Sequence, residues 1–222
     1  MKISIITAVY NRQATIGQAI ESVQAQTYPD VEHLIIDGAS TDNTLGEVER
    51  RQSRAMKISS GPDNGVYDAI NKGIALATGD VVGLLHSDDF IVHERVLEHI
   101  VAAFAESGAD AVYGDLEYVL AGNPERVVRH WQAGEFCPSL LARGWMPPHP
   151  TLFLRRHVFE RWGAYDTSYR IAADYDAILR WFSKDEFHAF YIPDVLTRMR
   201  LGGESNGSLK RIVRKSREDL RA

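Results

Sequence analysis

The sequence contains little that would cross-link the chain or tie it to a metal through sulfur. Cys137 is the single cysteine among 222 residues, which excludes an internal disulfide framework, a cysteine-rich zinc site and an iron–sulfur site. A chain of this length can bury enough apolar surface to fold without such aids. A single cysteine also favours a reducing compartment. The sequence therefore predicts a globular chain stabilised by its own core.

Long apolar runs, internal repeats and low-complexity segments are also missing. No run approaches the roughly 18 residues that a membrane-spanning helix needs. The segment 1–12 turns polar where a signal peptide would need small residues, so we expect a buried strand there. With 25 Lys and Arg against 30 Asp and Glu, the net charge of −5 argues against nucleic acid as the main partner. These features predict a cytoplasmic protein.

The first half of the chain alternates short β-rich segments with segments of helical periodicity. Strands are expected at residues 3–9, 33–36, 57–59 and 81–85, and helices at 15–26, 45–49 and 68–78. This order is typical of a mostly parallel central sheet flanked by helices, and such sheets bind ligands at the carboxyl ends of their strands. The sequence thus predicts a single α/β domain with its chemistry in the loops after the strands.

The second half is less regular. We expect a helix over 93–107, a strand around 111–113, a polar segment to about residue 134 and a helix over 174–183. The segment 144–150 contains three prolines, which remove hydrogen-bond donors and fix φ, so it is predicted to be non-helical. No linker divides the chain into two domains.

Ser87-Asp88-Asp89 directly follows the predicted strand at 81–85. Two adjacent carboxylates repel each other and lose solvation energy on burial unless a cation or water lies between them. At the end of a parallel strand they suit Mg²⁺ or Mn²⁺, which take oxygen ligands and keep phosphate oxygens in their shell. The alternative is a solvated Asp-Asp cap on the next helix. Their position directly after the strand favours the metal site.

Polar groups follow the other three strands as well. Asp37 is held at the end of an apolar strand, which a plain strand-to-helix turn does not explain, and Ser40 or Thr41 can cap the helix after it. Asp63 opens the loop after the third strand, and segment 8–12 comes after the first. Four polar loops at one sheet edge indicate a binding site for a polar or anionic ligand.

Together these loops resemble a known family. The series TAVYNR, IIDGASTDNT, DNGVYDAINKGIALATGD and LLHSDD is similar to the inverting family 2 glycosyltransferases of the GT-A fold over roughly residues 1–120, and the likeness continues through AADYDAILRW to about residue 205. The resemblance implies a GT-A-like domain over 1–205, with a nucleotide-sugar-binding half (1–120) and an acceptor half (121–205). It also implies transfer of a sugar from a nucleotide-diphospho-sugar to an acceptor hydroxyl, with inversion and with a divalent cation, Mn²⁺ or Mg²⁺.

The resemblance assigns roles to individual residues. Asp174 would be the catalytic base, Asp89 the direct metal ligand and Asp88 a neighbour of both ribose and metal. The residues implied to contact the donor are Thr7, Ala8, Tyr10, Asn11, Asp37, Asp63, Asn71, Asp88, His149, Arg198 and Arg200. Simpler explanations stay open: a helix N-cap for Asp174, a packing role for His149 and surface solvation for the two arginines.

The chain departs from the family pattern at three positions. Gly38 stands where many members carry a second aspartate, Ile70 where many carry an arginine, and His86 where an aspartate is commoner. The first two departures weaken the assignment of the nucleobase. The resemblance implies a UDP-sugar donor first, with GDP- or dTDP-sugars as alternatives. For His86, a buried histidine with satisfied hydrogen bonds is favoured over a metal ligand. The acceptor is expected to be a glycan or a lipid-linked glycan.

Two other function classes stay open beside glycosyl transfer. A nucleotidyltransferase would share the sheet and the metal-diphosphate chemistry, but the loop after the first strand lacks the glycines usual in such enzymes. A non-catalytic module that binds sugar nucleotides or glycans would keep the pocket without turnover. The presence of Asp88, Asp89 and Asp174 argues against that loss.

The end of the chain is basic on an acidic protein. Residues 206–222 are expected to form an amphipathic helix, with an apolar stripe of Leu209, Ile212, Val213 and Leu220 beside a cationic face. Such a helix either packs on the domain or docks weakly and reversibly on the anionic cytoplasmic face of the membrane.

Overall fold

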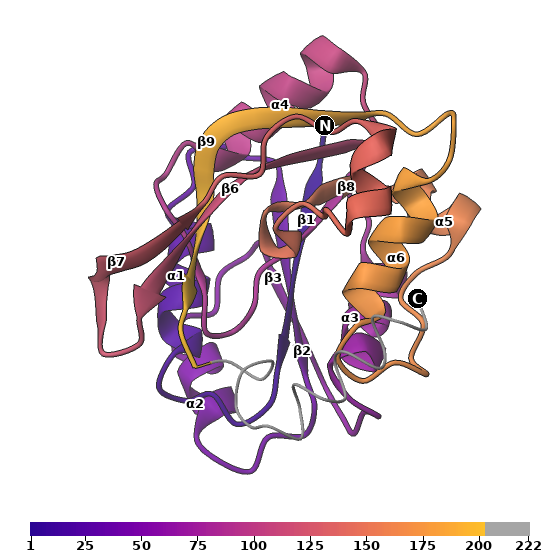
Figure 1. The fold of residues 1–222 in the computed structure, drawn as a ribbon. Helices are drawn as coiled ribbons and strands as arrows, with labels where there is room; N and C mark the ends of the chain where they lie inside the picture. Colours follow the sequence, from indigo (N-terminus) through magenta and orange to yellow (C-terminus); the bar gives the residue numbers. More distant parts are fainter. Residues whose placement is uncertain (203–222) are drawn as a thin grey trace.

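The computed structural model describes residues 1–202, and its first half alternates strands and helices as the sequence predicts (Figure 1). In chain order the elements are β1 (Ile3–Val9), α1 (Ile16–Gln24), β2 (Val31–Asp37), α2 (Thr44–Glu49), β3 (Met56–Ser60), α3 (Val66–Leu76) and β4 (Val81–Leu84). Each expected strand and helix of this half is present, with ends that differ by a few residues.

The second half adds a further set of strands and helices. They are β5 (Phe90–Ile91), α4 (Val96–Ser107), β6 (Ala111–Leu120), β7 (Asn123–Trp131), β8 (Phe153–Arg155), α5 (Arg156–Trp162), α6 (Ala173–Phe182) and β9 (Ala189–Arg200), with short 3₁₀ turns at Pro138–Arg143 and His149–Thr151. The expected C-terminal helix at 206–222 lies outside the described residues.

The strands of the described chain form one nine-stranded sheet. Its spatial order is β3-β2-β1-β4-β8-β6-β9-β5, with β7 paired to β6. β1 runs parallel to β2 and β4, β2 to β3, and β6 to β9, whereas β8 inserts antiparallel between β4 and β6. The predicted mostly parallel sheet is confirmed, and the carboxyl ends of β1 to β4 share one edge.

Helices cover both faces of this sheet. One core packs α3, α5 and α6 against the strands, and the opposite cores pack α1, α2 and α4 (Figure 1). Gly73 lets α3 lie directly on β1, because a Cβ at this position would overlap the Ile6 side chain. The two-sided burial explains why β1 and β4 are apolar along nearly their whole length.

The structure corrects three expectations for the second half and one for a cap. The segment expected to be merely polar forms the β6–β7 hairpin; β7 lies at an edge with mostly exposed side chains, so no apolar pattern marks it. The helix expected from residue 93 begins at Val96. The proline-rich segment ends in a 3₁₀ turn at His149–Thr151, which tolerates a proline at its start.

The expected cap of α2 is also corrected. Asp42, rather than Ser40 or Thr41, accepts the backbone N–H of Thr44 where α2 begins (2.9 Å).

Candidate active site

The loops after β1 and β2 are joined by hydrogen bonds at the shared sheet edge. Asn11 adopts a left-handed backbone (φ 51°), its N–H donates to Ser40 Oγ (2.9 Å) and its Oδ1 accepts from the Thr41 N–H (2.8 Å). Asparagine is one of the few non-glycine residues that tolerate this conformation. The adjacent Tyr10 is 56% exposed, so its ring is accessible at this edge of the sheet. The first two loops are thus held together with an accessible aromatic face.

Asp37 lies almost fully buried at the end of β2. Its carboxylate accepts hydrogen bonds from Ser60 Oγ (2.6 Å) and from the Ser40 N–H (3.1 Å). An ionised carboxylate has about four acceptor positions, so acceptor capacity is left for a ligand. Gly38 allows the third loop to approach, because a Cβ there would overlap Asp63 Oδ2. The predicted nucleoside residues Asp37 and Asp63 are therefore neighbours.

The Asp88–Asp89 pair follows β4 and lies beside the end of β9. Asp89 is 1% exposed, its Oδ1 accepts the Arg200 N–H (3.0 Å), and its Oδ2 is buried with no hydrogen-bond partner in the described part of the chain. Burial and the neighbouring Asp88 charge raise the pKa of Asp89, although Arg200 opposes the rise. A buried carboxylate oxygen without a partner is a costly arrangement that a bound cation would relieve. The donor set therefore fits a divalent cation.

Of the two arginines predicted to contact the donor, Arg200 packs on the Asp88–Asp89 pair and Arg198 does not. The Arg200 guanidinium donates to the Asp88 carbonyl and to Gln18 Oε1 and lies over the Phe90 ring. Burial lowers the pKa of Arg200, although the nearby aspartates oppose the shift. Arg198 instead pairs with Glu117 on β6 (2.9 Å). Donor contacts for both arginines stay predictions.

Asp174 lies in the first turn of α6 with both carboxylate oxygens engaged. The Tyr67 hydroxyl lies 3.0 Å from Oδ1, and His149 Nδ1 lies 3.1 Å from Oδ2. Ala172 holds the N-cap position, so the N-cap explanation for Asp174 is wrong. The nearby Asp176 pairs with Arg180 (3.1 Å) and faces a different partner. The helix thus directs Asp174, and not its neighbour, toward the loops of the sheet edge.

Two histidines connect Asp174 with the loop of the aspartate pair. His149 Nε2 lies 2.8 Å from His86 Nε2, and His86 is two residues before Asp88. Burial and the adjacent His149 lower the pKa of His86 to about 4, although the charges of Asp88 and Asp174 oppose this. His86 is therefore neutral at pH 7, and one ring of the pair donates while the other accepts.

Two predicted donor residues have their side chains engaged elsewhere. Thr7 is buried in β1, where its Oγ1 lies 2.9 Å from His33 Nε2. The Asn71 side-chain amide makes two hydrogen bonds to the backbone of Tyr165. Its Nδ2 donates to the carbonyl (2.8 Å), and its Oδ1 accepts from the N–H (3.1 Å). This geometry does not support a donor contact by either side chain. Ala8 lies half-buried on β1, on the side of α3.

Sequence reasoning missed two polar side chains of this site. Tyr67 lies in the first turn of α3 and reaches Asp174 from 107 positions away, and Gln18 on α1 reaches Arg200 from 182 positions away. Tyr67 stands within the quoted motif DNGVYDAIN, but no local pattern indicates its partner. The two histidines were each noticeable in the sequence, whereas their contact depends on the folded chain.

Comparison with known sequences identifies relatives over most of the chain. The family model described as glycosyl transferase family 2 matches residues 4–164. A PGL/p-HBAD biosynthesis glycosyltransferase of Mycobacterium bovis BCG is 32% identical over 208 residues, which is 91% of this chain and 78% of the relative. An uncharacterised glycosyltransferase of Nostoc sp. is 34% identical over 186 residues, or 78% of this chain and 57% of that protein.

Solved structures share the fold at low sequence identity. TarS 1-349 of S. aureus in complex with UDP-GlcNAc matches 94% of this chain and 62% of its own with a TM-score of 0.75 at 22% identity. Mannosyltransferase PcManGT of Pyrobaculum calidifontis in complex with GDP-Man and Mn²⁺ matches 100% of this chain and 64% of its own with a TM-score of 0.70 at 20% identity. This chain thus spans less than two thirds of either protein.

These matches confirm the two expectations that rested on resemblance, the fold and the family. The two solved structures share the fold of this chain, with TM-scores of 0.75 and 0.70. The family model spans more than half of the chain and includes β1 to β4, all four loops of the sheet edge and the segment that carries His149. The chain belongs to glycosyl transferase family 2.

Proposed function

We propose that this protein transfers a hexosyl or similar glycosyl group from a nucleotide-diphospho-sugar to an acceptor hydroxyl with inversion at the anomeric carbon. The observation that carries the proposal is the Asp174 carboxylate. It is oriented by Tyr67 and His149 and is connected through His86 to the loop of the buried Asp88–Asp89 pair. A general base and a site for the leaving diphosphate are then close together, as direct displacement requires.

The donor would lie at the carboxyl edge of β1 to β4. Tyr10, Asn11, Asp37 and Asp63 would line this edge. Hydrogen bonds of Asn11 with Ser40 and Thr41, and of Asp37 with Ser60, hold the edge together before any ligand arrives. Preformed loops reduce the ordering cost of binding. A UDP-sugar is the first expectation, with GDP- and dTDP-sugars as alternatives. Two solved structures of similar fold are complexes with UDP-GlcNAc and with GDP-Man, so both donor classes belong in the test.

A divalent cation, Mn²⁺ or Mg²⁺, would be held by Asp89 and Asp88. The support is the buried, unpartnered Oδ2 of Asp89 together with an all-oxygen donor set. When bound, such a cation supplies positive charge that stabilises the leaving diphosphate. The Arg200 N–H holds the other Asp89 oxygen, so Oδ2 is the oxygen that would bind the cation.

The chemical step follows from the position of Asp174. The acceptor oxygen forms a bond to the anomeric carbon while the bond from that carbon to the phosphate oxygen breaks. The acceptor proton goes to an Asp174 oxygen, and the nucleoside diphosphate leaves with the bonding electron pair. Tyr67 and His149 lie beside the two oxygens of this carboxylate and fix its direction. Attack opposite the leaving group inverts the anomeric configuration.

The acceptor is proposed to be a glycan or a lipid-linked glycan, met in the cytoplasm or at the cytoplasmic face of the membrane. In the described part of the chain, no helix is both long enough and apolar enough to span a bilayer. The support for membrane contact is the basic sequence of residues 206–222. Truncation after Gly207 should abolish sedimentation with anionic vesicles at low salt; unchanged sedimentation would contradict the membrane contact.

The test of the proposed function is a panel of UDP-, GDP- and dTDP-sugars assayed with Mn²⁺, Mg²⁺ or EDTA. We expect one donor class to be consumed, release of the nucleoside diphosphate, dependence on the cation, and a product of inverted configuration by NMR. Formation of a nucleoside triphosphate and a sugar 1-phosphate when pyrophosphate is added to the panel would instead indicate a nucleotidyltransferase. Donor binding without turnover across a panel of glycan acceptors would indicate a non-catalytic module.

A further inference from the structure

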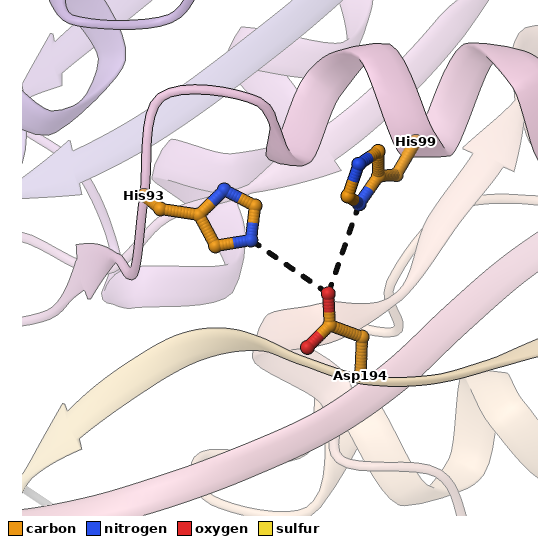
Figure 2. A group of neighbouring side chains, drawn as sticks. All are labelled: His93, His99 and Asp194. Atoms are coloured by element: carbon orange, nitrogen blue, oxygen red, sulfur yellow. Dashed lines mark ion pairs between the residues drawn. The ribbon is translucent and has the colours of Figure 1, made fainter.

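Two histidines and one aspartate form a cluster on a surface apart from the active site. Figure 2 shows His93, His99 and Asp194, with both rings turned toward one oxygen of the carboxylate. The side chains are 37%, 38% and 46% exposed, so dissolved ions reach them. None of the three takes part in the proposed glycosyl transfer, so a role for this cluster is independent of that reaction.

The fold brings these residues together from three segments. His93 lies in the turn between β5 and α4, and His99 lies in the first turn of α4. On β9, the pairing with β6 shifts register between Ile192 and Val195, so Asp194 falls in a β-bulge. Bulges redirect side chains that a regular strand would point elsewhere. A backbone hydrogen bond from Val92 to Leu196 (3.3 Å) holds the two segments side by side.

The spacing of the ligand atoms is close to that of a metal site. Asp194 Oδ2 lies 3.7 Å from His93 Nε2 and 3.7 Å from His99 Nδ1, beyond ordinary hydrogen-bond distance. The three ligand atoms all lie within 4.8 Å of one another. Ligands of a tetrahedral zinc ion, each about 2.1 Å from the metal, are about 3.4 Å apart. Small side-chain rotations, which this exposure permits, are enough to reach that geometry.

We propose that His93, His99 and Asp194 bind a divalent transition-metal ion of the zinc class, with water completing the coordination. Two imidazole nitrogens and one carboxylate oxygen suit Zn²⁺, Co²⁺ or Ni²⁺, whereas Mg²⁺ and Mn²⁺ prefer all-oxygen sites. The cluster therefore differs in ion preference from the Asp88–Asp89 pair.

Coordination changes which nitrogen of the His93 ring carries the proton. His93 Nδ1 accepts the Arg95 N–H (3.2 Å), so the proton of the neutral ring is on Nε2, the atom that faces Asp194. Metal binding at Nε2 shifts this proton to Nδ1 and breaks a long, exposed hydrogen bond. Because that exchange costs free energy, we expect micromolar rather than nanomolar affinity.

The bound ion would tie the β5–α4 turn to β9. β5 begins directly after Asp89, and β9 ends at Arg200, whose N–H holds the Asp89 carboxylate. A cross-link between the two segments stabilises the pairing that positions the aspartate pair. An ion that binds only the folded chain also raises its melting temperature.

The test is calorimetric titration of the full chain, freed of metal by a chelator, with ZnCl₂ and separately with MgCl₂. We expect one Zn²⁺ site that Mg²⁺ does not fill, a rise in melting temperature with Zn²⁺, and visible absorption typical of bound Co²⁺. His99→Ala and Asp194→Asn should each weaken Zn²⁺ binding tenfold or more. His157→Ala is the matched control, because His157 pairs with Asp110 on another surface (2.9 Å).

Two results would overturn the proposal. One is the absence of Zn²⁺ binding to the unaltered chain, and the other is unchanged Zn²⁺ affinity in both variants, which would locate the ion elsewhere, such as at His86 and His149. Circular dichroism without metal checks that each variant is folded. If His99→Ala fails to fold, Asp194→Asn decides, since it keeps the shape of a side chain that is nearly half exposed.

Discussion

The Asp174 carboxylate has a polar partner beside each oxygen, whereas Asp89 keeps one buried oxygen without a partner in the described chain. Partners on both sides of a carboxylate fix its direction, which suits a base that must face its acceptor. A buried carboxylate oxygen without a donor suits a cation. The two aspartates thus differ in role, base for Asp174 and cation ligand for Asp89, because their surroundings differ.

Removal of the His149 ring should slow the chemical step. His149→Ala removes the ring whose Nδ1 lies 3.1 Å from an Asp174 oxygen, and a polar contact of this kind to a charged group is worth about 1.5–3 kcal/mol. We expect kcat to fall about 10-fold to 100-fold while the donor Kd is nearly unchanged. Steady-state kinetics with calorimetry of donor binding measure both, and His188→Ala, on an exposed surface, is the control. Equal kcat in both variants would show that His149 does not position the base.

Neutralisation of Asp89 should stop turnover without unfolding the chain. Asp89→Asn keeps the shape of the side chain and removes the charge that burial makes costly, so the melting temperature should not fall. We expect turnover to fall by about 100-fold or more, because the anionic oxygen at the leaving-group site is lost. Asp30→Asn, at the opposite end of β2, is the control. Full cation-dependent activity in Asp89→Asn would show that the metal site lies elsewhere.

At the scale of elements, the parallel pairs of the first half depend on buried polar contacts between neighbouring strands. Thr7 on β1 meets His33 on β2, and burial lowers the pKa of His33 to about 3. His33 is neutral in the folded chain at any pH near neutrality. Lowering the pH therefore destabilises the β1–β2 pair through His33 before most carboxylates become protonated.

The unfolding free energy should decline in mild acid because of His33. Its folded pKa is depressed from 6.5 to about 3, so between these values the unfolded chain binds one more proton. Stability is then lost as the pH falls, by up to about 1.4 kcal/mol per pH unit. Urea unfolding at pH 7, 6 and 5 should give a steeper decline for the natural chain than for His33→Gln. Parallel pH profiles would contradict this.

The contact between α3 and β1 should not tolerate a methyl group at Gly73. The added Cβ of Gly73→Ala would overlap Ile6, so the helix must move away from the sheet. We expect a loss of about 1–3 kcal/mol, typical of overpacked cores, despite the better helix propensity of alanine. Gly122→Ala is the control, because nothing lies near a Cβ there. Chemical denaturation of both variants measures the difference; equal stability would contradict the tight contact.

At the scale of the whole molecule, the first half could be predicted because its signals are local. β1, β2 and β4 each contain a short apolar run, β3 gives a weaker signal, and the parallel order follows from alternation with helices. The loops that carry Asp37, Asp63 and Asp88 therefore had to share an edge. The second half depends on contacts between distant segments: β8 inserts beside β4, and β7 is an exposed edge strand without an apolar pattern.

The same contrast applies to the candidate site. Asp88, Asp89 and Asp174 stand in motifs that are noticeable in the sequence, but their surroundings join residues far apart in the chain. Tyr67 and His149 meet at Asp174 only because α3, the proline-rich turn and α6 pack into one core. Motifs thus indicate the reacting groups, whereas the partners that tune them follow from packing.

The most direct test of the proposed mechanism compares transfer and donor binding in Asp174→Asn. The base acts on the acceptor, so the variant should lose transfer by about 100-fold or more while its donor Kd, measured by calorimetry, stays within a few-fold of the natural value. Asp176→Asn, in the same turn of α6 but paired with Arg180, should retain activity. Loss of donor binding in Asp174→Asn, or transfer at the natural rate, would contradict the assignment of Asp174 as the base.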